Sequence, residues 1–319
     1  MPNLKDIRRR IKSVKNTQKI TQAMRMVAAA KVKRAENRVK ASRPFCDALN
    51  TVFAQVLGKA QQSGVLAQAD SPLLQALTRT SVKRLAVVVV SSDRGLCGAF
   101  NTSVIRQAFR LETQLLSQGI EPVFFTVGRK ITQALKKHSK SVVAESVMDM
   151  TAAPSVADAE TISKAILTQL SAGDVDGVVV LSSHFKSMIS FQLLLTPILP
   201  LEGLWLEHLA EHVEIARPIV PALSEEVSRA SKIPAEMVFE PSAEAVLTDV
   251  VPMMITQQIF GLMLESAASE LAARMTAMAN ATSNARDMID RLTIVYNKAR
   301  QAAITQEILE VVSGANALV

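Results

Sequence analysis

The chain has 319 residues, of which 49% are hydrophobic, 20% are charged and only 4% are aromatic. This composition supports one or two domains with an apolar core and favours long helices over a β-sandwich or barrel. The two cysteines, Cys46 and Cys97, form no metal-ligand or disulfide pattern. The sequence contains no run of about 18 apolar residues of the kind that would indicate a membrane span. We therefore expect a helix-rich protein with no disulfide framework, zinc site or membrane-spanning helix.

The positive charge of the chain is concentrated at its N-terminus. The net charge is +7, but residues 1–43 carry fourteen Lys or Arg side chains against Asp6 and Glu36, a net of +12, and the remainder carries −5. This basic segment lacks the apolar core and cleavage site of a secretory signal. Its helical pattern also continues past residue 40, unlike that of a mitochondrial leader.

The first sixty residues predict one very long helix. Residues 3–59 contain a single proline, Pro44, and no glycine before Gly58. Apolar residues recur three and four positions apart, which places them on one narrow stripe of a helix and is typical of a coiled coil at this length. The stripe comprises Leu4, Ile7, Ile11 and Val14, then, after a phase slip, Ile20, Met24 and Val27, and finally Val32, Ala35, Val39, Phe45, Leu49, Val52 and Val56.

Between residues 80 and 200 the period changes to that of alternating strands and helices. Residues 85–90 are wholly apolar and mostly β-branched, as in a strand buried on both faces. This alternation predicts a small Rossmann-like α/β domain with a mostly parallel sheet. Further strands are predicted at about 123–127, 141–144, 177–182 and 188–195, the last antiparallel to its predecessor, and helices at 102–118, 129–138 and 156–171.

The C-terminal part of the chain predicts a second long helix over residues 242–319. Its stripe is strictly periodic: Leu271, Met275, Met278, Thr282, Ala285, Ile289, Leu292, Tyr296, Ala299 and Ala303, shifting to Ile304, Ile308, Val311 and Ala315. Two long stripes at the two ends of one chain are most economically buried against each other. We therefore expect an antiparallel coiled coil of residues 1–60 and 242–319, an α/β domain at 80–200 and a loop-rich insertion at 201–241.

Candidate catalytic and metal-binding groups are few. The loop at residues 91–98 follows a buried strand, where phosphate-binding loops occur, but it has neither common glycine signature. We expect Asp93 and Arg94 to hold this loop in place and Cys97 to be a buried thiol. The pair His208 and His212 has a metal-compatible spacing but lacks a third ligand, and Glu225 and Glu226 point to different helix faces. We expect no catalytic site, no metal site and no cofactor.

The basic N-terminal helix leaves two main interpretations open. Basic helices neutralise the phosphates of nucleic acids, but no aromatic residue for base stacking precedes Phe45. A basic rod inside an acidic or neutral protein sleeve explains the same residues equally well. A plain solvated coiled coil is the third alternative.

Three segments resemble the gamma subunits of F-type ATP synthases, and together they cover about 110 of the 319 residues. The N-terminus reads MPNLKDIRRRIKSVKNTQKITQAMRMVAAAKVKRAENRVKASRPF, and the loop after the first buried strand reads SSDRGLCGAFN. The C-terminal helix reads ESAASELAARMTAMANATSNARDMIDRLTIVYNKARQAAITQEILEVVSGANAL. Their order and positions at both termini match the family.

The resemblance implies a rotor rather than an enzyme. In this family the two terminal helices turn inside a ring of alpha and beta subunits, and the globular part lies beside the epsilon subunit and the membrane c-ring. The implied place is the cytoplasmic face of a bacterial plasma membrane or thylakoid, or its organellar equivalent, as a peripheral part of the complex, with no nucleic acid bound. Matching positions suggest contacts with the alpha and beta subunits at Met24, Arg274, Arg300, Gln301, Thr305 and Glu307.

One region departs from compact bacterial members of the family. Residues 201–239 are longer here, at the place where photosynthetic members carry an insertion, but the typical motif of that insertion is not recognisable. The region contains no cysteine, so a thiol switch of the plant type is unsupported.

Overall fold

The computed structural model describes residues 4–64, 66, 69, 71–149, 153–188, 190–201, 214, 215 and 239–316. The chain forms two compact units. One consists of residues 1–29 and 274–319, here called the helical-pair unit, and the other of residues 30–273, the sheet unit. Two long helices, α1 (Leu4–Gln62) and α8 (Ala243–Asn316), contribute to both units.

The sheet unit contains a five-stranded sheet in the order β3-β2-β1-β4-β5. Parallel pairing joins β1 to β2 and β4, and β2 to β3, whereas β5 is antiparallel to β4. The strands are β1 (Arg84–Val90), β2 (Glu121–Val127), β3 (Val143–Val147), β4 (Gly177–Ser187) and β5 (Ser190–Leu199). The other helices among the described residues are α3 (Pro72–Gln75), α4 (Phe100–Ser117), α5 (Arg129–His138) and α6 (Val156–Ser171).

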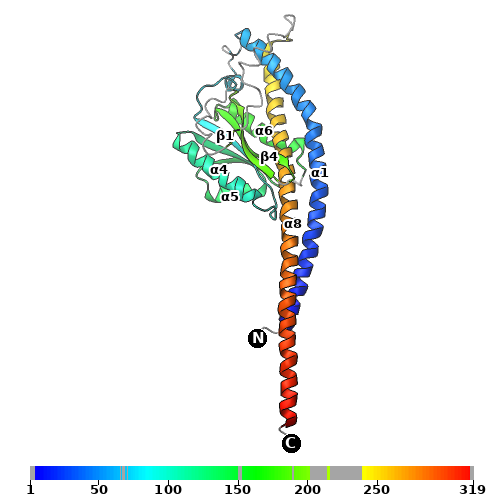
Figure 1. The fold of residues 1–319 in the computed structure, drawn as a ribbon. Coiled ribbons are helices and arrows are strands. Elements are labelled where there is room, and N and C mark those ends of the chain that lie inside the picture. Colours follow the sequence, from blue (N-terminus) through cyan, green and yellow to red (C-terminus); the bar gives the residue numbers. More distant parts are fainter. Residues whose placement is uncertain are drawn as a thin grey trace. The chain divides into compact units, whose positions relative to one another are not determined.

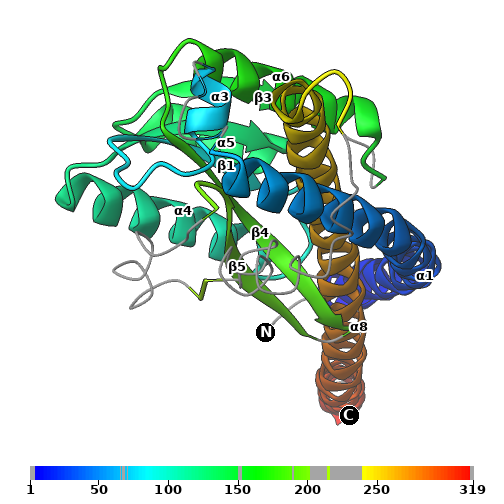
Figure 2. The same ribbon diagram turned by 90° about the horizontal axis from the view of Figure 1, so that it is seen from above.

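Helices cover both faces of the sheet, because alternate residues of the central strands point to opposite sides (Figures 1 and 2). On one face Leu85, Val87 and Val89 pack with buried residues of α4 and α5. On the other, Ala86 and Val88 belong to a core shared with α6 and with the parts of α1 and α8 that lie in this unit. The continuous apolar run of β1 therefore reflects burial on both faces, as the sequence predicts.

In the helical-pair unit, α1 and α8 run antiparallel. Thr282 Oγ1 donates to Thr21 Oγ1 at 2.8 Å, while Ile289 borders the same groove as Ile11, so lower numbers on one helix face higher numbers on the other. The residues of α8 that the sequence places on its stripe, from Met275 to Ala303, are buried or half-buried. That prediction is confirmed for the described side chains.

The stripe of α1 differs from the predicted one. The phase slip is wrong: Ile20 and Val27 are 60% and 57% exposed, whereas Thr21 and Ala28 are 8% and 2% exposed. The buried stripe passes without interruption from Val14 through Gln18 and Thr21 to Ala28. Thr21 can be buried there because its hydroxyl forms a hydrogen bond with Thr282. Ala28 can be buried because its small side chain allows close approach of the facing helix.

Three further expectations need correction. Phe45 and Val52 are 55% and 46% exposed instead of lying on the stripe. The strand expected at 141–144 is β3, Val143–Val147. The shifted end of the α8 stripe is not buried within the chain, because Ile304, Ile308 and Val311 are all exposed.

The sequence indicates no membrane span, yet by length and composition alone one helix among the described residues meets that test. It is Ala243–Ser313, whose most apolar window has a mean hydropathy of 1.3. Burial accounts for part of this apolar character: 39% of that window is buried, and Val251, Ile255 and Ile259 of α8 are 0% exposed in the core of the sheet unit.

The fold class is confirmed: two long terminal helices accompany a mostly parallel α/β sheet. The four domain bounds given from the sequence stay a prediction. Most of the insertion expected at 201–241 lies outside the described residues, as do His208, His212, Glu225 and Glu226.

Candidate partner-protein interface

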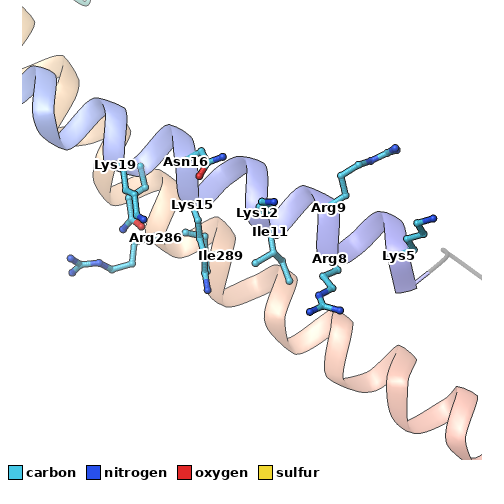
Figure 3. Close-up of a pocket in the computed structure, with 11 residues that line it drawn as sticks. Lys5, Arg8, Arg9, Ile11, Lys12, Lys15, Asn16, Lys19, Arg286 and Ile289 are labelled. Atoms are coloured by element: carbon cyan, nitrogen blue, oxygen red, sulfur yellow. The ribbon is translucent and has the colours of Figure 1, made fainter.

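A groove between α1 and α8 in the helical-pair unit is lined mainly by cations (Figure 3). Its volume is about 890 Å³. Figure 3 shows that the basic side chains come from successive turns of α1, with Arg286 and Ile289 on the neighbouring helix. The lining residues are Lys5, Arg8, Arg9, Ile11, Lys12, Lys15, Asn16, Gln18, Lys19, Arg286 and Ile289.

The local sequence of α1 explains why the cations gather there. Ile7, which is 5% exposed, and the half-buried Ile11 and Val14 turn toward the partner helix. Basic residues that flank this stripe at spacings of three and four are then directed to its edges. The long aliphatic parts of these side chains run beside the buried stripe, while their charged ends stay in water.

The charge of the groove is uncompensated among its own lining residues, none of which is acidic. Arg9 pairs with Asp6, which lies outside the lining, at 3.2 Å. Within the described part of the chain, Arg8, Lys12 and Lys15 form no hydrogen bond or ion pair. Closely spaced like charges repel one another, so an acidic surface seated in the groove would be stabilised and steered toward it.

A second surface of this unit is apolar. The C-terminal part of α8 exposes aliphatic side chains to solvent: Ile304, Ile308, Leu309, Val311 and Val312, at 47%, 57%, 60%, 72% and 51%. Contiguous exposed apolar residues mark a surface that another protein covers. The helical-pair unit therefore presents a cationic groove and an apolar helix end, two surfaces suited to protein partners.

The residues suggested as partner contacts lie at different places in this unit. Met24 is half-buried, and Arg274 is half-buried with an interaction inside the chain. Arg300, Gln301, Thr305 and Glu307 are exposed, and Thr305 donates to the carbonyl of Gln301 at 2.9 Å. None of the six lines the cationic groove. The assigned contacts stay a prediction.

Arg286 is a groove residue that sequence reasoning missed. The run of basic residues on α1 already stands out by its spacing, but which residue of α8 faces it depends on the pairing of the two helices. Once Thr21 is placed opposite Thr282, Arg286 and Ile289 fall beside the basic face of α1. The periodic stripe of α8 would predict the position of Arg286, provided that the correct stripe of α1 is known and the two are paired.

The loop after β1 is held by its own polar contacts. Asp93 Oδ1 accepts from the backbone N–H groups of Arg129 (2.9 Å) and Asp149 (3.1 Å), as expected for a residue that fixes the loop. Cys97 is 1% exposed, and the Asn101 amide donates to its sulfur at 3.1 Å. Within the described residues there is no cluster of His, Cys, Asp and Glu that could hold a metal ion.

Comparisons with known proteins agree with the fold. A family model described as ATP synthase matches residues 3–318. The chain is 45% identical to the ATP synthase gamma chain of Cyanothece sp. and 44% identical to that of Rippkaea orientalis, in both cases over 100% of this chain and of the relative.

Solved structures include a chain from the central stalk and c-ring of Tetrahymena thermophila mitochondrial ATP synthase. It has a TM-score of 0.56 and 26% identity, covering 82% of this chain and 99% of that one. A chain of Euglena gracilis mitochondrial ATP synthase shares the fold with a TM-score of 0.54 at 19% identity, covering 91% and 95%. These comparisons give no support to the nucleic-acid interpretation. The chain belongs to the family of ATP synthase gamma chains, which form the central stalk.

Proposed function

We propose that the chain acts as the shaft that carries torque between the ion-driven c-ring in the membrane and the catalytic beta subunits. Its terminal helices turn inside a ring of alternating alpha and beta subunits, and its sheet unit meets the epsilon subunit and the c-ring. The chain itself carries out no chemistry. It is bound to the cytoplasmic face of a bacterial plasma membrane or thylakoid only through the complex.

The observation that carries this proposal is the chemistry of the helical-pair unit. Its helix end exposes Ile308, Leu309 and Val311, while the groove on α1 is lined by cations without an acidic side chain among them. An apolar inner surface of the partner ring would cover the aliphatic helix end, and acidic loops of the partners would neutralise the cationic groove. A ring of partner subunits around a turning shaft offers both surfaces without a permanent covalent or metal link.

The physical mechanism follows from asymmetry. A shaft that presents cations on one side and apolar residues at its end touches each surrounding beta subunit differently at any moment. Such differential contact shifts each catalytic site between conformations of unequal nucleotide affinity. Turning the shaft then moves the catalytic sites through these conformations one after another. Met24, Arg274, Arg300, Gln301, Thr305 and Glu307 are the proposed contact positions.

The decisive experiment replaces Arg300 and Gln301 together by alanine in the assembled complex. Both side chains are exposed on α8, so the folded chain should be retained. Losing an interface contact worth about 1 kcal/mol weakens binding by about fivefold. We expect complex yield or ATP-driven ion pumping to fall by at least that factor. Pumping, ATP hydrolysis and complex yield are measured together.

Arg110→Ala provides the matched control, because Arg110 is exposed on α4 of the sheet unit. That variant should assemble and pump as the parent does. Normal yield and pumping in the Arg300/Gln301 variant would refute the assigned contacts. Purification of the native chain without alpha and beta subunits, but with salt-sensitive nucleic acid, would refute the shaft itself.

A further inference from the structure

A small cavity in the sheet unit has a basic rim and an apolar floor. Its volume is about 190 Å³. It is bounded by α1, by the segment that precedes α6 and by α8, within one compact unit. The lining residues are Lys31, Arg34, Ala35, Arg38, Ala153, Pro154, Leu264 and Ala267.

The cationic rim comes from one face of α1. Lys31, Arg34 and Arg38 are spaced three and four residues apart, so they lie along the same side of the helix. Arg38 Nη2 donates to the carbonyl of Pro154 at 2.8 Å. In the described part of the chain Lys31 and Arg34 form neither a hydrogen bond nor an ion pair, and no acidic residue lines the cavity. Two cations at its mouth therefore lack a counter-charge.

The floor is apolar and packed. Leu264 is 3% exposed and Ala35 is 9% exposed, and both belong to a small cluster of buried residues between α1 and α8. Pro154 is buried as well. A ligand with an apolar body gains by covering this floor, whereas a bare inorganic anion would lose water there without replacement.

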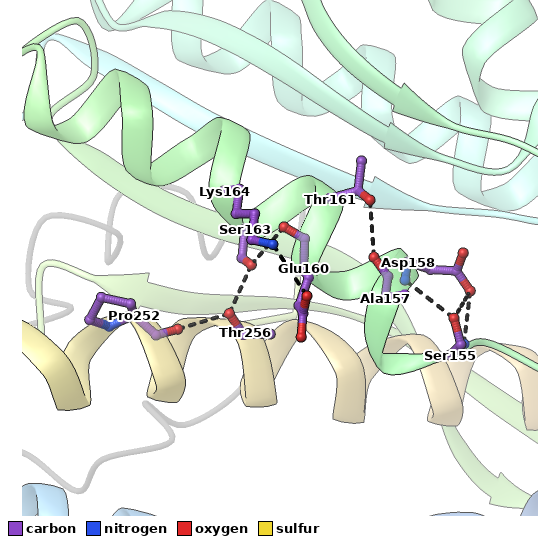
Figure 4. Close-up of polar contacts among 9 residues, drawn as sticks. All are labelled: Ser155, Ala157, Asp158, Glu160, Thr161, Ser163, Lys164, Pro252 and Thr256. Carbon is purple, nitrogen blue, oxygen red and sulfur yellow. Dashed lines mark hydrogen bonds and ion pairs between the residues drawn. The ribbon is translucent and has the colours of Figure 1, made fainter.

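Hydrogen bonds order the start of α6, which directly follows the cavity-lining Pro154, and join α6 to α8 (Figure 4). Ser155, next to Pro154, caps α6: its hydroxyl accepts from the Asp158 N–H at 3.3 Å, and the Asp158 carboxylate accepts from the Ser155 N–H at 2.8 Å. Further along α6, Ser163 accepts a hydrogen bond from Thr256 of α8 at 2.8 Å. Together with the hydrogen bond from Arg38 to the Pro154 carbonyl, these contacts order part of the cavity surroundings before a ligand binds.

We propose that this cavity binds a small organic acid, namely a carboxylate on a compact aromatic or branched aliphatic body. The carboxylate lies between Arg34 and Lys31, and the body covers Leu264 and Pro154. Drug-sized or nucleotide ligands usually occupy about 300–1,000 Å³, so the cavity is too small for them. Cationic ligands are repelled by the rim. The bound acid would join α1, the start of α6 and α8, and so would stabilise the sheet unit against unfolding.

Isothermal titration calorimetry of the purified full-length chain with three probes tests the proposal. Benzoate supplies both the charge and the apolar body, benzyl alcohol lacks the charge, and acetate lacks the body. We expect benzoate to bind with about millimolar affinity, in keeping with so few atoms, and the other two to bind at least about tenfold more weakly.

Two variants test the location of the site. Arg34→Gln should weaken benzoate binding by about tenfold, the loss expected for one charge-assisted hydrogen bond. Ala267→Leu should abolish binding by filling the cavity. Arg43→Gln removes an exposed cation of α1 outside the lining and should leave binding unchanged. Circular dichroism checks that all three variants retain the fold.

Four results would overturn the proposal. These are no heat of binding at millimolar benzoate, equal binding of benzyl alcohol, equal weakening in Arg34→Gln and Arg43→Gln, and loss of benzoate binding in the assembled complex. The last would mean that a partner chain covers the cavity. Retained binding in that complex, with the variant pattern above, supports a site for a free acid.

Discussion

The two compact units use the same two helices but bury them to very different extents. In the sheet unit, Val88, Phe125 and Ile255 are all 0% exposed within one shared core. In the helical-pair unit, the most buried seam residues include Ala28 at 2% and Thr21 at 8%, with solvent on either side. The same helices are therefore stabilised by broad packing in one unit and by a narrow seam in the other.

This difference shows how one chain combines a stable body with surfaces left free for partners. A sheet covered on both faces supplies most of the apolar burial that stabilises a fold. A two-helix seam buries much less and leaves most of each helix surface accessible. Exposed Ile20, Val27 and Ile308 are tolerated where partner subunits, rather than the chain itself, are expected to cover them.

The largest effect should come from the core of the sheet unit. Phe125→Ala empties a site that is 0% exposed on β2, and we expect it to lower the free energy of unfolding by about 3–5 kcal/mol. Phe45→Ala, at a position that is 55% exposed on α1, should change it by less than about 0.5 kcal/mol. Urea denaturation followed by circular dichroism measures both. Equal losses would remove the contrast between buried and exposed positions.

An intermediate loss of stability should distinguish the observed buried stripe of α1 from the predicted one. Ile7→Ala removes a residue that is 5% exposed, whereas Ile20→Ala removes one that is 60% exposed. We expect about 2 kcal/mol of destabilisation for the first and less than about 0.5 kcal/mol for the second in the isolated chain. Thermal melting of the helical signal provides the measurement. If Ile20→Ala is the more damaging variant, α1 contains the phase slip after all.

The smallest effect concerns two ion pairs on α1, in which the half-buried Glu36 pairs with the exposed Lys33 and Lys40. Hydrogen bonds from Lys40 and then Lys33 lower the pKa of Glu36 below its ordinary value. A lowered pKa in the folded state contributes stability above the unfolded pKa, and this contribution is lost as the pH falls through the folded value. Glu36→Gln should therefore make the melting temperature slightly less sensitive to acid below about pH 4.

Asp249→Asn is the control for this pH series, because Asp249 is an exposed acid of α8. Its acid dependence should remain that of the parent chain. If the melting temperature of Glu36→Gln falls with acid just as that of the parent does, the two ion pairs of Glu36 add nothing measurable to stability.

The periodic parts of the fold were predictable, and the exceptions have physical causes. The stripe of α8 is strict, and β1 is continuously apolar, so both elements follow from spacing alone. The stripe of α1 misleads because Ile20 and Val27 are more apolar than Thr21 and Ala28. What decides burial there is the facing helix, which accepts a hydroxyl partner at Thr282 and favours a small side chain at Ala28.

The candidate interface was only half predictable for the same reason. The basic residues of α1 and their spacing are visible in the sequence, and they indicate an anionic partner surface. Arg286 joins them only through the pairing of two segments more than 260 residues apart. The cavity beneath Arg34 likewise depends on three elements meeting, which no local pattern reports.

The hydroxyl pair of Thr21 and Thr282 has a consequence for axial slippage. If α8 moved by one heptad, the Thr21 hydroxyl would face Met275 or Ile289, and neither side chain offers a strong hydrogen-bond partner. Such a slip would cost the hydrogen bond between the two helices, although each hydroxyl would keep a carbonyl partner on its own helix, Gln18 for Thr21 and Met278 for Thr282. A shaft that transmits torque has to keep its two helices in a fixed axial register, and the hydrogen bond between Thr282 and Thr21 favours one register.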